Sequence, residues 1–342
     1  MTLVLTWGRH LPTAVEVLVV IPLAGAVLAA VHHAEVVAHR VGEPFGSLIL
    51  AVAVTIIEVG LIVTLMISGG PGVDSLARDT VFAAVMITCN GIFGLTLLIG
   101  ALRRRIAVFN PEGTGAALTT VIVLTAMTLV LPTFTTSEPG PVFSGAQLTF
   151  AAVASLVLYV LFVVMQNVRH RDYFLPPEGH GTEAEHAPPP EGRSALVSLL
   201  LLAAALLGVV GLAKVESHPI ESAVQAAGLP PSFVGVLIAL LVLLPETLAA
   251  ARNATHDRVQ IGVNLALGSA IASVGLTIPS IAVASIWLSG TLTLGLGAVQ
   301  IVLLVLTAGV GILTVMPGRA TLMQAALHLS VCAAFLFLAA KP

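Results

Sequence analysis

The chain contains little charge for its length. Only 9% of its 342 residues are Asp, Glu, Lys or Arg, whereas 57% are hydrophobic, and the mean hydropathy is +1.06. Soluble domains carry about 25% charged residues, so this composition predicts an integral membrane protein. The net charge of −3 also argues against a nucleic-acid partner, which would require a basic excess.

Cysteines and common catalytic motifs are equally scarce. The two cysteines, Cys89 and Cys332, lie inside apolar runs, which argues against disulfides and against a thiolate metal site. The sequence contains no H-E-x-x-H or G-x-S-x-G motif. It does not begin with a short apolar stretch and a small-residue cleavage site, so we expect no removable signal peptide.

What the sequence does contain is a series of apolar runs separated by Gly, Pro or charged residues. They predict an all-α integral membrane protein with about ten transmembrane helices. The predicted spans are 14–32, 45–68, 77–101, 116–136, 146–168, 194–213, 231–252, 259–285, 289–312 and 319–339. Residues 169–193 are rich in Pro, Gly, Glu and His and predict a flexible linker, because they lack the apolar side chains of a core.

The basic residues provide an independent test of this topology. Most of the 14 Lys and Arg residues fall on one predicted side of the membrane, the bias expected of a cytoplasmic face. The residues on that side are Arg40, Arg103, Arg104, Arg105, Arg169, Arg171, Arg193, Arg252, Arg258 and Arg319. The linker is therefore predicted to be cytoplasmic, and both termini are predicted to face outward.

The linker divides the chain into two halves, residues 1–168 and 194–342, with five predicted spans each. The first span enters the membrane from outside and the sixth from the cytoplasm, so the halves have opposite topology. Together they predict two inverted five-helix repeats, a plan that many secondary transporters share.

Each half carries one acid inside its second span. Glu58 lies 13 residues after Phe45, and Glu246 lies 14 residues after Ser232. A carboxylate near the membrane midplane costs roughly 2.5–3.5 kcal/mol, so residues of this kind are usually functional. Inverted repeats would bring both acids to one central site.

Polar residues accompany the acids in the second, third and eighth spans. Ser269, Ser273 and Thr277 recur every four residues, a spacing that places them on one helix face. The candidate cation- and proton-binding residues are Glu58, Glu246, Asn90, Ser269, Ser273, Thr55, Asn264 and Gly268. In transmembrane helices Ser and Thr also bond to their own turn, and Asn90 could equally hold two helices together.

Histidines cluster where the first span meets the predicted cytoplasm. His32, Glu35 and His39 share a helix face that could bind a metal or sense pH, although a solvated helix end is the more common explanation. His180 and His186, in the linker, could attract cations weakly, although a disordered segment explains them as well.

The acid-bearing regions resemble the two α-repeats of the calcium/cation antiporter superfamily, in particular its bacterial calcium(sodium, potassium)–proton antiporters. The resemblance rests on GEPFGSLILAVAVTIIEVGLIVTLMI with VFAAVMITCNGIFGLTLLIG, and on LLPETLAAARNATHDRVQIGVNLALGSAIASVGLTIP. In that family each repeat has a G-N-x-x-E-type motif followed in the next span by a G-S-x-x-S-N-type motif. The positions that match these motifs are Glu58, Glu246, Asn90, Gly268, Ser269 and Ser273.

The sequence also departs from these motifs. The Gly-Asn pair before each acid is absent, and Val85-Met86 stands where the third span of the family has Gly-Ser. These departures remove hydroxyl or amide oxygens that would complete a calcium shell, but they leave the two acids in place.

The resemblance implies an antiporter of the bacterial inner membrane that exchanges cytoplasmic Ca²⁺, Na⁺ or K⁺ for protons. No cofactor is expected beyond these transported ions, and membrane lipid and inorganic cations are the expected partners. Glu58 and Glu246 would bind either protons or the cation, with spans 1 and 6 sliding past the rest to alternate access. Two protons for one Ca²⁺ would leave the charge of the site unchanged.

Two other functions remain open from the residues. A passive cation channel would use the same polar lining, and an intramembrane enzyme could use the two acids as an acid/base pair on a lipid. Cation-driven proton movement separates the three, because a channel shows no proton countertransport and an enzyme moves neither ion.

Overall fold

The computed structural model describes residues 13–42, 45–177, 192–288 and 290–342. Nearly all of these residues are helical. In the first half the helices are α2 (Thr13–Val41), α3 (Phe45–Ser68), α4 (Leu76–Met86), α5 (Phe93–Arg104), α6 (Pro111–Thr125) and α7 (Gly145–Val164). In the second half they are α8 (Gly192–Ala226), α9 (Phe233–Val242), α10 (Leu244–Thr255), α11 (Val259–Ala272), α12 (Ile278–Ala284), α13 (Ala298–Val315) and α14 (Leu322–Ala340).

Several spans contain π-helical turns, which join two α-helices or extend one. They are η2 (Ile87–Ile92), η3 (Ala126–Val130), η5 (Met165–Arg169) and η7 (Ser273–Thr277). Short 3₁₀ segments are η1 (Val73–Ser75), η4 (Leu131–Thr133) and η6 (Arg171–Phe174). Turns of the π type insert an extra residue into the helix and frequently lie at functional sites.

The number of spans agrees with the sequence-based prediction. Among the described residues, nine helical segments are long and apolar enough to cross a membrane, and α9 with α10 forms a tenth if this bent pair counts as one span. The chain is therefore an all-α, multi-pass membrane protein.

The helices of three spans differ in their bounds from the predicted spans. Helices α2 and α8 have 29 and 35 residues and extend well past the predicted ends of spans 1 and 6. At about 1.5 Å per residue they are roughly 44 and 52 Å long, more than a hydrocarbon core of about 30 Å requires. The ninth span begins at Ala298 rather than 289, because the preceding residues pair with other loops: Thr293 donates its N–H to the Asp74 carbonyl.

The segment predicted as a linker begins with ordered structure. Residues 171–174 form the turn η6, in which Phe174 is buried and packs edge-to-face on Phe162. Gly113 makes room for this turn, because a Cβ there would lie 2.2 Å from the Tyr173 carbonyl oxygen. Residues 178–191 of this segment, including His180 and His186, lie outside the described residues.

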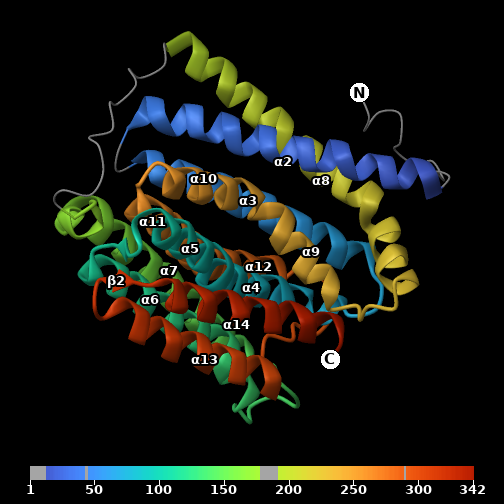
Figure 1. Ribbon diagram of the computed structural model, residues 1–342. Coiled ribbons are helices and arrows are strands. Elements are labelled where there is room, and N and C mark those ends of the chain that lie inside the picture. Colours follow the sequence, from blue (N-terminus) through green and yellow to red (C-terminus); the bar gives the residue numbers. More distant parts are fainter. Residues whose placement is uncertain (1–12, 43–44, 178–191, 289) are drawn as a thin grey trace.

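The described residues form two large hydrophobic cores. One joins α2 and α8 with α3 and α9, and the other fills the space among the remaining spans. Figure 1 shows α2 and α8 together along one side of the bundle, with α3 between them and the other helices. Close approach of α3 to α8 depends on Gly60, where a Cβ would lie 2.9 Å from Val210 Cγ2.

The packing confirms the inverted repeat. Helix α3 of the first half packs on η7 and α12 of the second, and α9 of the second half packs reciprocally on α4 of the first. The loops show the same reciprocity. Strands β1 (Ala107–Val108) and β2 (Arg319–Ala320) pair antiparallel, with Ala107 opposite Ala320, and a bridge between Val142 and Thr293 pairs the two corresponding loops.

Candidate cation-binding site

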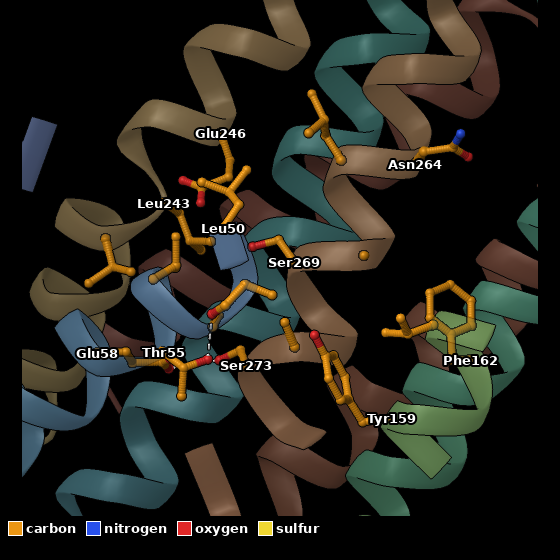
Figure 2. Close-up of a pocket in the computed structure, with 18 of the residues that line it drawn as sticks. Leu50, Thr55, Glu58, Tyr159, Phe162, Leu243, Glu246, Asn264, Ser269 and Ser273 are labelled. Atoms are coloured by element: carbon orange, nitrogen blue, oxygen red, sulfur yellow. Dashed lines mark hydrogen bonds between the residues drawn. The ribbon is translucent and has the colours of Figure 1, made fainter. Parts of the chain in front are cut away.

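A cavity of about 170 Å³ lies where the two repeats meet. Its walls come from α3, α4, α7 with η5, α9, α10, and α11 with η7. The polar residues that line it are Thr55, Glu58, Tyr159, Gln166, Glu246, Asn264, Ser269 and Ser273. A space of this size can hold several water molecules or a partly hydrated cation. The structure thus brings both predicted acids to one cavity (Figure 2).

Glu58 lies on α3 and is buried, with 3% of its surface exposed. Ser273 Oγ donates a hydrogen bond to Glu58 Oε1 (2.7 Å), and Thr277 Oγ1 donates to Oε2 (2.9 Å). Each carboxylate oxygen therefore has one hydroxyl donor from the polar stripe of the eighth span. Thr277 belonged to the predicted stripe but not to the predicted binding residues, and the four-residue spacing was the signal that identifies it.

Glu246 owes its position to a break in the seventh span. Pro245 has no N–H to continue the helical ladder, so α9 ends at Val242 and α10 starts at Leu244 after a bend of 51°. The break places Glu246 in the first turn of α10, where the helix dipole favours an anion. Its Oε2 atom is buried and has no hydrogen-bond partner among the described residues. This oxygen is therefore available to a proton or a cation.

Three other predicted residues lie on the cavity wall. The Thr55 hydroxyl donates a hydrogen bond to the Ala51 carbonyl of its own helix (2.8 Å), one of the two roles that the sequence allowed. Its oxygen can still accept a hydrogen bond or bind a cation. The Ser269 hydroxyl makes no hydrogen bond within the described part of the chain, and Figure 2 shows it between Glu246 and Ser273 in the view. A Cβ at Gly268 would meet no atom within 4 Å, so this position is open to the cavity.

Asn264 also lines the cavity, but its amide is already engaged. Its Nδ2 donates to the Phe174 carbonyl (2.7 Å), and its Oδ1 accepts from Gln260 Nε2 (2.8 Å). The same Gln260 accepts the N–H of Asn110 through Oε1 (2.6 Å). Asn264 therefore ties the ordered start of the linker to the eighth span, and in Figure 2 it points away from the two acids.

Asn90 does not line this cavity, so the structure does not bring this predicted residue together with the two acids. Its Nδ2 donates to Thr307 Oγ1 (2.9 Å), and its Oδ1 lies 3.2 Å from His328 Nδ1. His328 Nε2 in turn lies 3.2 Å from Thr314 Oγ1. The side chain joins the third span to the ninth and tenth, which is the helix-joining role that the sequence left open.

Two cavity residues, Tyr159 and Gln166, were absent from the predicted site. Both belong to the fifth span, outside the two acid-bearing regions. With Phe162 and Val163 they follow the i, i+3, i+4, i+7 spacing of one helix face. This face was hard to recognise in the sequence, because most residues of the fifth span are apolar and few of them are buried within the protein.

The cavity reaches Glu58 from the predicted cytoplasmic side. Its α3 residues, from Leu50 to Glu58, occupy the part of the helix that follows the predicted cytoplasmic end. Beyond Glu58, the buried residues Ile62, Ala77 and Ile281 form a small apolar cluster. This cluster separates the acid from the predicted outer side.

The histidine cluster of the first span does not make a metal site in this structure. Within the described residues, no group of three or more His, Cys, Asp or Glu side chains is arranged to hold a metal ion. His32 and His33 instead contact each other edge-to-face, with ring centroids 5.4 Å apart.

Two inverted repeats that each contribute one acid to a shared cavity have the architecture of a secondary ion transporter. The chain belongs to the sodium/calcium exchanger protein family, because residues 11–168 and 197–341 match the sequence model of that family. Both repeats are included in this match. The resemblance to the calcium/cation antiporter superfamily is thereby confirmed, and the chain is a membrane antiporter rather than an enzyme.

Individual relatives extend over nearly the whole chain. A protein of Sinorhizobium fredii (y4hA), named as a candidate ionic transporter, is 46% identical over 321 residues, covering 94% of this chain and 87% of the relative. The sodium-potassium/proton antiporter ChaA of Escherichia coli K12 is 31% identical over 336 residues, covering 96% and 91%. The solved structure of native YfkE has a TM-score of 0.73 at 18% identity, covering 97% and 94%, and shares the fold.

Proposed function

We propose that the protein exchanges a cytoplasmic metal cation, Na⁺, K⁺ or Ca²⁺, for protons, with Glu58 and Glu246 as the shared binding site. The observation that carries this proposal is the meeting of the two acids in one cavity. One carboxylate is held by two hydroxyls, and the other presents a buried oxygen without a partner. The sodium-potassium/proton exchange named for the ChaA relative supports the same class of cargo.

The exchange follows from charge balance. Two ionised carboxylates that face one mostly apolar cavity repel each other, so protons or a cation are expected to neutralise their charge. Two protons leaving for one Ca²⁺ keep the net charge at zero. Protons and the metal cation therefore compete for the same carboxylate oxygens, so the site binds one or the other.

The donor set suits hard cations. Carboxylate and hydroxyl oxygens are the ligands that Na⁺, K⁺ and Ca²⁺ accept, and Ca²⁺ takes about six to eight of them, so water would complete the shell. The Ser269 hydroxyl has no hydrogen-bond partner within the described part of the chain, so its oxygen is free to bind the cation. Access would alternate as α2 and α8, which share a core separate from most other spans, slide along the bundle.

The test uses purified protein in sealed vesicles that enclose a pH-sensitive dye. Addition of NaCl, KCl or CaCl₂ in turn should release protons in the direction opposite to the cation, and the membrane potential should be clamped during each addition. Glu138→Gln, a change at an exposed loop acid, serves as the matched control and should behave as wild type. Cation uptake without proton movement would contradict antiport and favour a channel.

A further inference from the structure

We propose that the fifth span, α7 with η5, supplies two uncharged oxygen ligands along the cation's path, the hydroxyl of Tyr159 and the side-chain amide of Gln166. This inference rests on the proposed function and deepens it, because it adds two ligands from a span outside the acid-bearing regions. The ligand class is a hard inorganic cation that exchanges water for protein oxygens.

One face of the fifth span runs along the cavity. Tyr159, Phe162, Val163 and Gln166 all line it, and their spacing places them on a single helix face. The two middle residues are apolar, so the polar groups stand at the two ends of the stripe. Gln166 lies nearer the predicted cytoplasmic end of the span, and Tyr159 lies deeper, at the level of the eighth-span serines.

A glycine on the eighth span leaves the space in which Tyr159 lies deep in the cavity wall. A Cβ at Gly275 would lie 2.8 Å from Tyr159 Cβ, so only glycine allows the fifth span to approach the eighth this closely. The side chain is buried, with 3% exposed, and Figure 2 shows its hydroxyl directed into the cavity. A buried tyrosine hydroxyl normally has a hydrogen-bond partner, but this one makes none within the described part of the chain. A cation or its water would supply that partner.

Gln166 differs from the two asparagines predicted to bind the cation. Both Asn264 and Asn90 have their amide groups engaged with other protein atoms. Gln166 is half-buried, lines the cavity, and makes no hydrogen bond to any described residue. It also lies in the π-helical turn η5, a type of turn frequent at functional sites. Of these three amides, Gln166 is the one whose oxygen has no hydrogen-bond partner among the described residues.

Uncharged oxygens have a distinct effect on transport. They replace water around the cation without adding charge, so they change its affinity but not the number of protons exchanged. Loss of one should therefore raise the KM for the cation and leave the maximal rate and the pH dependence nearly unchanged. A merely structural role would lower the amount of active protein instead.

The experiment compares Tyr159→Phe and Gln166→Leu in the vesicle assay, with NaCl, KCl and CaCl₂ as separate probes on the cytoplasmic side. Each variant should raise the KM about tenfold, the effect of removing one polar contact to a charged group, with the maximal rate within about twofold of wild type. The matched controls are Tyr173→Phe, at the chain's other tyrosine, and Gln225→Leu, at an exposed glutamine. Both should keep the wild-type KM. Gln166→Glu keeps an oxygen in place and should also keep a low KM.

A wild-type KM in both variants, while Glu58→Gln and Glu246→Gln are inactive, would overturn this inference and leave the proposed function standing. A fall in maximal rate without a change in KM would show a structural role and would also overturn it. Proton-coupled transport by Glu58→Gln would overturn the proposed function itself.

Discussion

Glu58 and Glu246 occupy matching places in the two repeats, yet their surroundings differ. Both oxygens of Glu58 accept hydroxyl hydrogen bonds from the eighth span, whereas Glu246 Oε2 has no partner among the described residues. The π-helical turns η2 and η7 interrupt the third and eighth spans in overlapping parts of the two repeats. The acid-bearing spans differ more, because α3 continues unbroken past Glu58 whereas Pro245 breaks the seventh span beside Glu246. The side chains of the third and eighth spans add to this difference.

The repeat alignment locates this difference. Val85-Met86 matches Gly268-Ser269, so Asn90 corresponds to Ser273. Ser273 contacts Glu58, but the amide of Asn90 is bound by Thr307 and His328 instead of reaching Glu246. The third span thus directs its polar group toward the ninth and tenth spans. Glu58 is thus held by two protein hydroxyls, and under the proposed function the unpartnered oxygen of Glu246 would take its partner from the transported ion.

The largest expected effect comes from removing either acid. Glu58→Gln and Glu246→Gln keep the side-chain size but cannot release a proton, so each should abolish exchange in the vesicle assay. The double variant should be no worse than the singles, because the acids act as one unit. Acidification should inhibit wild-type cation uptake by competition, and that inhibition should disappear from any residual cation binding in the double variant. Substantial proton-coupled transport by either single variant would rule out a shared site.

A smaller effect should follow from removing the donors that distinguish Glu58. In the Ser273→Ala, Thr277→Ala double variant the ionised carboxylate loses two charge-assisted hydrogen bonds, so protons compete more strongly with the cation. The pH of half-maximal uptake should move upward, and the KM should rise about tenfold at fixed pH. Uptake measured across a pH series provides the check. An unchanged pH profile would mean that these bonds do not set the difference between the two acids.

Asn90 tests the other side of the comparison. Asn90→Ala breaks a buried network and leaves Thr307 and His328 without this partner, so the free energy of unfolding should fall by about 1–3 kcal/mol. The KM for the cation should not change. Thermal unfolding in detergent and the vesicle assay measure the two quantities, and Thr307→Val should be non-additive with Asn90→Ala. A raised KM in folded protein would instead place Asn90 among the ligands in another conformation.

The smallest effect is expected at an acid outside the membrane-spanning segments. Asp257 pairs with Arg104 (3.0 Å) and Arg103 (3.6 Å), and hydrogen bonding by Arg104 lowers the pKa of the Asp257 carboxyl. Because the pKa of Asp257 is lower in the folded than in the unfolded protein, its ionised carboxyl stabilises the fold at a pH above the unfolded-state pKa. This stability is lost as the pH falls through the folded-state pKa. Because the pair is exposed, Asp257→Asn should cost only about 0.5 kcal/mol or less at neutral pH. Thermal unfolding of the variant checks this. A large loss of stability would show that the ion pair contributes more than an exposed surface salt bridge does.

The transmembrane character and the two acids could be predicted because they are local properties of the chain. Apolar runs of spanning length, and single carboxylates within two of them, stand out in any window of the sequence. The four-residue stripe of Ser269, Ser273 and Thr277 was equally visible, because helix periodicity fixes which residues share a face. The predicted family followed from these same residues.

Other features depend on which helices become neighbours, and no window of the sequence contains that information. Asn90 and Asn264 carry equally suitable amides, but tertiary contacts to His328 and to the Phe174 carbonyl engage them elsewhere. Tyr159 and Gln166 reach the cavity because the fifth span packs against Gly275. The sequence by itself determined the number of spans, the inverted repeat and the acid within the second span of each repeat, since hydropathy and helix periodicity are set by the order of residues. Only the tertiary structure decided which polar groups remain free to meet a cation, because a hydrogen bond to a neighbouring helix removes a ligand as effectively as a mutation would.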